Sequence, residues 1–187
     1  MKLSVLIPGV PSRMDPPVLR HLLRQREKLA NPEDVEIIYL LDTKSMSVGA
    51  KRNRLVQMAG GTYITFVDDD DRVTDDYLSS LVDATSQNTD VIVFPVKVSL
   101  DGARPKPCYY SITYPKDQNY VWGYERLPNH IMCVKRSIAT KVGFPEINRG
   151  EDSLYAKRLK PFLETEYNIG KVLYFYDYNS RTTETQR

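Results

Sequence analysis

The chain has 187 residues, of which 41% are hydrophobic and 27% are charged, and its formal net charge is +2. This length suits one domain with a buried core of its own and leaves little room for two, so we expect a single domain over residues 1–187. So small a net charge gives no argument for nucleic acid or an anionic membrane as a partner, although it does not exclude a local basic patch.

Two features of the chain bear on its compartment. Cys108 and Cys133 are the only cysteines, and they have neither the spacing of a metal site nor the number that a disulfide framework needs. The apolar run at residues 3–7 is far too short for a signal sequence, and no stretch approaches the length of a membrane span. We therefore expect a cytoplasmic protein with no transmembrane segment. The sequence does not indicate its oligomeric state.

The first half alternates apolar strands with amphipathic helices. The strands are apolar nearly throughout, as in a parallel sheet covered by helices on both faces. Proline opens the first helix, and Gly60-Gly61 closes the second. The order predicts an α/β fold with a Rossmann-like, mostly parallel sheet and right-handed crossovers. The predicted strands are 3–7, 35–41, 63–67 and 91–98, and the predicted helices are 16–30, 48–59 and 75–86, the last with Thr74 as N-cap.

The second half is less regular. Asp101-Gly102 predicts a hairpin turn after residues 96–100. Residues 104–128 are rich in proline, glycine and tyrosine, and we expect an irregular segment that faces a ligand or a partner. Five further features are predicted: strands at 131–134 and 172–176, helices at 137–142 and from Glu151, and a polar tail from Asn179.

The strongest chemical signal is the run of four aspartates at 68–71, directly after a predicted strand. Like charges about 4 Å apart repel by roughly 4 kcal/mol at an effective dielectric constant near 20, so something must offset the repulsion. A divalent cation such as Mg²⁺ or Mn²⁺ takes carboxylate oxygens and leaves positions open for phosphates. The alternative is helix N-terminal stabilisation, which Asp75 and Asp76 fit well. Because open sheets bind ligands at the carboxyl ends of their strands, we favour the cation.

Six blocks of the sequence form an ordered set: 3–8, 36–42, 50–54, 61–71, 142–145 and 150–153. Together they resemble, in the same order, family 2 glycosyltransferases. The resemblance covers about 150 residues and is fairly specific as an ordered set, although each block alone is weak. It implies the glycosyltransferase A fold in one domain, with 1–98 as the nucleotide-sugar-binding half and 99–187 as the acceptor-binding half.

The resemblance implies roles for individual residues. Asp42 matches a carboxylate that reads the nucleotide base, and Arg52 matches an arginine near the nucleotide. Asp68 and Asp70 match the Asp-x-Asp motif, with Asp70 the direct metal ligand. Asp152 matches the catalytic base of inverting members. The full predicted set is Asp152 and Glu151 for catalysis, Pro8, Gly9, Asp42, Arg52, Asp68 and Asp69 for donor binding, and Asp70, Asp68 and His130 for the metal.

Physical chemistry agrees with these roles. A departing nucleoside diphosphate concentrates negative charge, which a metal ion and Arg52 would stabilise. An acceptor hydroxyl is a poor nucleophile until a base such as Asp152 takes its proton. We therefore expect an inverting hexosyl- or pentosyltransferase that uses Mn²⁺ or Mg²⁺ and a nucleotide-sugar donor, with a UDP-sugar favoured. Its acceptor is a saccharide by default, or alternatively a hydroxylated or otherwise modified DNA base.

Each of these residues also has a purely structural interpretation. Glu151 and Asp152 would suit the N-terminus of a helix. Arg52 and its basic neighbours could form a solvated helix face. His130 is as well explained as a structural residue as by a ligand role. The aromatic residues Tyr120, Trp122 and Tyr124 could stack on a sugar or base, or pack in the core.

Two other functions stay open. A metal-dependent nucleotidyltransferase would use the same carboxylates, but it usually has a glycine-rich phosphate loop after the first strand, where this chain has only Gly9. A non-catalytic nucleotide-sugar-binding domain would bind nucleotide without turnover. Intact Asp68, Asp70 and Asp152 count against it.

Overall fold

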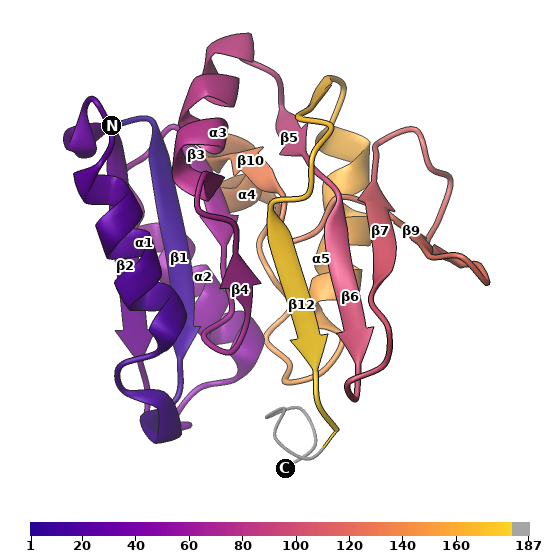
Figure 1. Cartoon of the computed structure of the whole chain (residues 1–187), viewed down its shortest axis with the longest axis horizontal. Coiled ribbons are helices and arrows are strands. Elements are labelled where there is room, and N and C mark those ends of the chain that lie inside the picture. The colour runs from indigo at the N-terminus through magenta and orange to yellow at the C-terminus, as the bar shows by residue number, and fades with distance from the viewer. Residues whose placement is uncertain (181–187) are drawn as a thin grey trace.

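The computed structural model describes residues 1–180 and contains two six-stranded sheets (Figure 1). In spatial order, sheet A consists of β11 (Glu166–Asn168), β5 (Val91–Val93), β10 (Cys133–Lys135), β3 (Tyr63–Phe66), β1 (Leu3–Gly9) and β2 (Val35–Leu41). Sheet B consists of β4 (Arg72–Val73), β12 (Tyr174–Tyr178), β6 (Val96–Leu100), β7 (Lys106–Tyr110), β9 (Tyr124–Arg126) and β8 (Gln118–Asn119).

Helices cover both faces of sheet A, as the sequence predicts. The helices α1 (Pro17–Glu27) and α3 (Tyr77–Ala84) contact each other on one side. On the other side, α2 (Val48–Met58), α4 (Arg136–Val142) and α5 (Glu151–Leu159) contact one another (Figure 1). The central strands are therefore shielded twice, and every residue of β3 is buried. This double cover explains why the strands are apolar runs and do not alternate.

The strand directions in sheet A follow the prediction in part. Strand β1 pairs in parallel with both β2 and β3. Strand β5 runs in the same direction, but β10 lies between β3 and β5 and is antiparallel to both. The residues of β10 come from the second half of the chain, so the repeating strand–helix pattern of the first half gave no sign of this insertion.

The predicted strand at 91–98 was wrong as one element. The structure divides it into β5 in sheet A and β6 in sheet B. Pro95 lies at the break, and proline cannot donate a hydrogen bond to a sheet ladder. The carbonyl of Pro95 instead accepts from the backbone N–H of Leu173, at 3.4 Å. The chain thereby crosses from one sheet to the other.

The segment 104–128 is more regular than predicted, since it contains β7, β8 and β9. The hairpin turn at Asp101-Gly102 is confirmed. Both residues have left-handed φ angles, 49° and 77°, as a two-residue turn between antiparallel strands requires. The strands it joins, β6 and β7, pair antiparallel. The sequence did not predict this sheet, because its strands combine tyrosines with polar residues.

Smaller differences concern the ends of elements. Helix α1 ends at Glu27, before the predicted stop at Asn31. Helix α3 begins at Tyr77, and Thr74 is not its cap, since its hydroxyl bonds the side chain of Asp76. Five unpredicted elements and two shifted boundaries add to the differences: 3₁₀ turns at 11–13, 32–34, 85–87 and 160–162, strand β11, a later start for β10 at Cys133, and a later start for β12 at Tyr174.

The polar tail predicted from Asn179 lies, from residue 181 onward, outside the described residues. Across residues 1–180, none of the helices combines the length and apolar character that crossing a bilayer demands.

Candidate active site

A cavity of about 520 Å³ lies where the carboxyl edge of sheet A meets one face of sheet B. Sheet A contributes Pro8, at the end of β1, and the four aspartates at 68–71, which follow β3. Arg52 of α2 and residues 150–153 at the start of α5 line it as well. The predicted ligand edge of the sheet is therefore hollow, in agreement with the rule for open α/β sheets.

Two of the four aspartates hold the turn itself. Asp69 is buried, and its carboxylate accepts from the backbone N–H of Val10, at 3.2 Å, and from Arg13 Nη2, at 2.6 Å. Asp71 is buried too, and it accepts from the hydroxyl of Tyr174, at 2.6 Å. Burial raises the pKa of both carboxyl groups, Asp71 the more strongly, and Arg13 partly offsets the shift at Asp69.

The other two aspartates are more accessible. Asp68 accepts from Arg52 Nη2 at 3.0 Å, and its second oxygen lies 3.5 Å from His130 Nε2. Burial alone would raise the pKa of Asp68, but Arg52 and His130 outweigh it and hold this pKa below its ordinary value. The side chain of Asp70 is 36% exposed, and its nearest cation is Arg13, at 3.5 Å. Adjacent residues of the run therefore differ: Asp69 and Asp71 hold the turn, whereas Asp68 and Asp70 are accessible from the cavity.

Arg52 joins the two sides of the cavity. Its side chain is buried and lies over the ring of Phe66, with the guanidinium carbon 5.1 Å from the ring centroid. Its Nη2 bonds Asp68, and its Nε bonds Glu151 at 3.4 Å. Its Nη1 is buried without a hydrogen-bond partner. Arg52 is therefore not part of a solvated helix face, and that interpretation is wrong. Arg54, on the same helix, is exposed.

Glu151 and Asp152 open α5 directly after Gly150, whose φ of 75° is left-handed. Glu151 is buried and forms an ion pair with Arg52. Asp152 lines the cavity and is only partly buried, and one of its oxygens accepts from the backbone N–H of Ser153 at 2.7 Å. A local bond within the first turn of α5 therefore occupies one oxygen of Asp152, and the carboxylate still borders the cavity.

The predicted base-reading residue, Asp42, does not line the cavity itself, but its partner Lys51 does. It accepts from the N–H and hydroxyl of Ser45 and lies 3.1 Å from Lys51 Nζ. Burial would raise its pKa, but Ser45 and Lys51 lower it to about 2. Lys51 also donates to the carbonyl of Gly9, at 2.8 Å. The sequence analysis missed this buried lysine, which ties the ends of β1 and β2 together.

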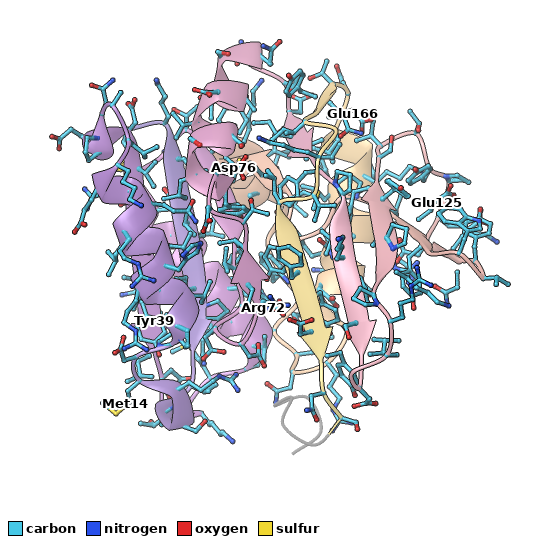
Figure 2. The ribbon with its side chains drawn as sticks, viewed as in Figure 1. Met14, Tyr39, Arg72, Asp76, Glu125 and Glu166 are labelled. Atoms are coloured by element: carbon cyan, nitrogen blue, oxygen red, sulfur yellow. The ribbon has the colours of Figure 1, made fainter. Side chains whose placement is uncertain are left out.

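Gly9 itself is required by close packing. A Cβ at this position would lie 2.3 Å from the ring of Tyr39. The Tyr39 hydroxyl donates to the carbonyl of Arg13, and Figure 2 shows Tyr39 near Met14, at the carboxyl ends of β1 and β2. The turn after β1 is thereby fixed against the sheet. This turn also positions Arg13 next to the acidic run, where it bonds Asp69.

His130 lies at the cavity wall with both ring nitrogens buried and without hydrogen-bond partners. Its backbone carbonyl accepts from Phe66 N, and its ring contacts the Phe66 ring edge-on. Its nearest charged neighbour is Asp68. The packing supports a structural role, and the two free nitrogens leave the ring able to bind something that enters the cavity.

The side chains at this edge fit a divalent cation that a ligand helps to hold. Over residues 1–180, no three His, Cys, Asp or Glu side chains are grouped closely enough to hold a metal on their own. Asp70 is open to the cavity and Asp68 is beside it. Mg²⁺ in particular is often bound by one or two carboxylates together with substrate phosphates. The donor set therefore suits a shared ion more than a closed protein site.

Sheet B supplies the opposite wall; the sequence predicted that 104–128 faces a ligand or a partner, but not that it forms part of a sheet. Its cavity-facing side chains alternate along the strands, with Tyr176 and Tyr178 on β12 and Tyr124 on β9. The spacing Tyr174-Phe-Tyr-Asp-Tyr178 was an available signal, because tyrosines two apart share one face of a strand. Tyr120 and Trp122 lie outside this lining and stack on each other with centroids 4.9 Å apart.

A sheet of this topology with an acidic run at the end of β3 is the glycosyltransferase A fold. The sequence model described as glycosyl transferase family 2 matches residues 19–138. The chain therefore belongs to glycosyl transferase family 2, as the ordered blocks predict.

Solved structures agree on the fold. The S. aureus TarS 1–349 structure is 18% identical, with a TM-score of 0.71, and the match covers 95% of this chain and 60% of that one. The same protein in complex with UDP-GlcNAc is 19% identical, with a TM-score of 0.68, and the match covers 96% of this chain and 59% of that one. The chain thus spans about three fifths of these relatives. No curated protein sequence matches it.

Proposed function

We propose that this protein is an inverting glycosyltransferase that moves a hexose or pentose from a nucleoside-diphosphate sugar to an acceptor hydroxyl. Membership of glycosyl transferase family 2 supports the reaction class. A UDP-sugar is the favoured donor, since the structural neighbour TarS was solved with UDP-GlcNAc and with UDP. The acceptor is a saccharide or, as the alternative, a modified DNA base.

The observation that carries this proposal is the environment of Arg52. Its guanidinium is buried at the cavity wall between Asp68 and Glu151, with Nη1 unpartnered. A buried donor without a partner is costly, by about 1–3 kcal/mol, so a ligand that satisfies it gains that energy. An anionic phosphate oxygen is the natural partner for a guanidinium N–H. We infer that Nη1 receives the donor diphosphate.

The chain's other residues divide the remaining work. Asp152 borders the cavity at the start of α5 and would take the proton of the acceptor hydroxyl, while Glu151 holds Arg52 in orientation. Pro8 and Gly9 form the rigid end of β1, beside which the nucleotide would lie. Asp42 would meet the base at the end of β2. Asp69 acts on the donor through the turn that it bonds at Val10 and Arg13.

Mn²⁺ or Mg²⁺ would be held by Asp70 and Asp68, with His130 as a further ligand, and would supply charge stabilisation to the departing diphosphate. The charge of the lining supports a bound cation. Among residues 1–180, eight acidic and only four basic side chains line the cavity, and a diphosphate entering such a site would be repelled. Arg52 and a bound cation together reverse that balance locally.

We also propose that residues 1–98 bind the nucleotide sugar and that residues 99–187 bind the acceptor. Residues 1–98 supply Pro8, Arg52 and the acidic run, and residues 99–187 supply Asp152 and the wall of sheet B. The halves are not separate folding units, since β10 completes sheet A and β4 belongs to sheet B. A cytoplasmic location is part of the proposal. The buried free thiols of Cys108 and Cys133 suit a reducing compartment.

The first test is a thermal-shift screen of UDP, GDP, CDP and ADP with and without Mn²⁺. A ligand that binds only the native state raises its melting temperature by mass action. We expect one nucleotide to raise it, and only with the metal. No shift with any of the four would overturn the donor assignment.

The second test is release of the nucleoside diphosphate from the corresponding nucleotide sugar. Asp152→Asn should abolish turnover and keep the nucleotide shift, because the carboxylate acts on the acceptor side. Ser153→Ala, which changes the adjoining side chain, is the matched control. Release of pyrophosphate instead would indicate a nucleotidyltransferase, and nucleotide binding without turnover would indicate a non-catalytic domain.

A further inference from the structure

The inner face of sheet B is an aromatic surface that Asp152 and the acidic run face across the cavity. On β12, Tyr174, Tyr176 and Tyr178 share one face of the strand. Tyr174 is fully buried and bonds the acidic turn, and the next two line the cavity. The strand register sets Tyr176 beside Val98 and Tyr178 beside Leu100, which also line it. The wall is therefore flat, aromatic and aliphatic at its centre.

The far end of this wall is polar. On β9, Tyr124 and Arg126 face the cavity, and Asn119 on β8 pairs with Tyr124. Arg126 donates to the carbonyls of Gln118 and Glu125 and to Asn119 Oδ1. Its guanidinium also lies 5.0 Å from the centroid of the Tyr124 ring. This arginine holds the hairpin together, and its Nη1 and Nη2 groups donate within it.

Charge decides what this wall can accept. Of the four basic residues in the lining, Arg13 pairs with Asp69 and Lys51 pairs with Asp42. Arg52 pairs with Asp68 and is committed to the donor, and Arg126 is held within the hairpin. Within residues 1–180, the lining on the sheet B side therefore offers an acceptor phosphate or sulfate only Arg126, whose Nη1 and Nη2 already donate within the hairpin. Acidic residues outnumber basic ones even if Asp71 is protonated.

We propose, resting on the function proposed above, that the acceptor is an uncharged saccharide that stacks on Tyr124, Tyr176 and Tyr178. The C–H face of a sugar ring is apolar and matches an aromatic face, while its hydroxyls bond polar rims such as Asn119 and the tyrosine hydroxyls. A nucleic acid needs cations along its phosphates. The acidic lining of this cavity would repel those phosphates, so the modified DNA base is disfavoured as acceptor.

Tyr176 is the central contact of this surface. Burial raises the pKa of its phenol, and the carboxylates of Asp71 and Asp68 raise it further. The hydroxyl therefore stays protonated and is a donor to a sugar oxygen. Its position on the face of β12 that carries Tyr174 sets it close to the acidic turn. An acceptor ring on Tyr176 would lie beside the donor site.

The test is saturation-transfer NMR on the whole protein with UDP and Mn²⁺ present. The probes are the uncharged trisaccharides chitotriose, cellotriose and xylotriose, a sulfated heparin tetrasaccharide, and a twelve-nucleotide single-stranded DNA. We expect at least one uncharged trisaccharide to bind and neither anionic probe to do so. Tyr176→Phe should weaken binding severalfold, and Tyr124→Ala more than tenfold. Tyr109→Ala, on the opposite face of β7, should leave it unchanged.

Melting temperatures establish that each variant folds, and the UDP shift with Mn²⁺ is recorded on the same samples. If neither UDP nor any of the other three nucleoside diphosphates of the first screen binds, the proposed function fails. If UDP binds but no uncharged trisaccharide does, only the inference about the acceptor fails. The inference about the acceptor is also overturned if the heparin tetrasaccharide or the DNA binds at a concentration equal to or lower than the one at which a trisaccharide binds. Saccharide binding that neither Tyr176→Phe nor Tyr124→Ala weakens overturns it as well.

Discussion

The hydroxyl of Tyr174 donates to Asp71 Oδ2 at 2.6 Å and accepts from the backbone N–H of Asp68 at 3.2 Å. The last described strand, β12, thus holds both ends of the acidic run that follows β3. Asp71 also accepts from the backbone N–H of Asp177, and Figure 2 shows Arg72 beside β12, where it pairs with Asp177. The two sheets are joined at the residues that the proposed chemistry uses.

Removing this tether should loosen the acidic turn. Tyr174→Phe takes away one donor and leaves the buried carboxyl of Asp71 without its strongest partner. We expect a loss of about 1–3 kcal/mol in the free energy of unfolding. Urea denaturation measures it. Tyr167→Phe, at an exposed tyrosine of β11, is the control, and an equal loss in both variants would contradict the assignment.

Arg52 should be far more sensitive than its exposed neighbour on α2. Arg52→Lys keeps the charge but cannot bond Asp68 and Glu151 together, because lysine lacks the planar fork of arginine. We expect at least a tenfold loss of nucleotide affinity, together with a lower melting temperature. Arg54→Lys should change neither quantity. Titration of the nucleotide by calorimetry compares them, and equal affinities for the two variants would remove Arg52 from the donor site.

The first half of the site could be predicted because its signals are local. The acidic run follows an apolar strand directly, and its position at the sheet edge follows from the strand–helix alternation. Arg52 could be assigned because it shares a helix face with apolar residues. The roles within the run could not be separated. Asp69 and Asp71 are buried by Arg13 and Tyr174, which are distant in sequence.

The sequence predicted β6 and, with a later start, β12 as strands, but it missed their assembly into sheet B for a different physical reason. Its strands mix tyrosines with charged residues, so neither the apolar run nor a clean alternation of apolar and polar residues is present. Strand β12 pairs with β6 from the middle of the chain. Pairing between strands so far apart in the chain depends on tertiary packing across the cavity, and it leaves no pattern in the local sequence. Pro95 did signal the break between the sheets, and the continuous apolar run around it masked that signal.

Stability at low pH should depend on Asp42. Its pKa is lowered to about 2 by Ser45 and Lys51, which outweigh burial. Its contribution is therefore present above the unfolded-state pKa and is lost as pH falls through the folded value. Asp42→Asn should reduce stability at neutral pH by about 1 kcal/mol, with solvent screening taken into account, and should flatten the decline between pH 4 and pH 2.

Melting temperatures across that pH range measure the effect. Asp15→Asn changes a carboxylate that is mostly exposed and should leave the profile of the parent protein intact. An Asp42→Asn profile that is parallel to the parent profile at every pH would contradict the linkage.

Gly49 should be intolerant of any side chain. A Cβ there would lie 1.8 Å from the carbonyl oxygen of Pro145, which is backbone and cannot move aside cheaply. Glycine to alanine within a helix ordinarily stabilises by up to about 1 kcal/mol. Here Gly49→Ala should instead destabilise by about 1–3 kcal/mol, since overpacking forces backbone shifts.

Gly60→Ala is the comparison for that prediction. The closest atom to its Cβ is the flexible end of Met1, at 2.8 Å, so the substitution should be nearly neutral. Urea unfolding of both variants decides the matter. A neutral Gly49→Ala would mean that α2 and the turn after α4 are not in the contact described.

The acidic run offers the sharpest separation between structure and chemistry. Asp69 is buried and bonds Val10 and Arg13, whereas Asp70 is open to the cavity. Asp69→Asn should lower the free energy of unfolding, because it weakens a buried ion pair and leaves Arg13 under-compensated. Asp70→Asn should leave stability nearly unchanged, since an exposed carboxylate near other acids is not a stabilising group.

The order should reverse for the metal. Asp70→Asn should weaken the Mn²⁺-dependent part of nucleotide binding tenfold or more, because a neutral amide is a poorer ligand for a hard cation than a carboxylate. Treatment of the parent protein with EDTA should have the same effect, and added Mn²⁺ should restore binding in the parent at once. If Asp70→Asn binds the nucleotide as the parent does, with and without Mn²⁺, the ion is not held at this carboxylate.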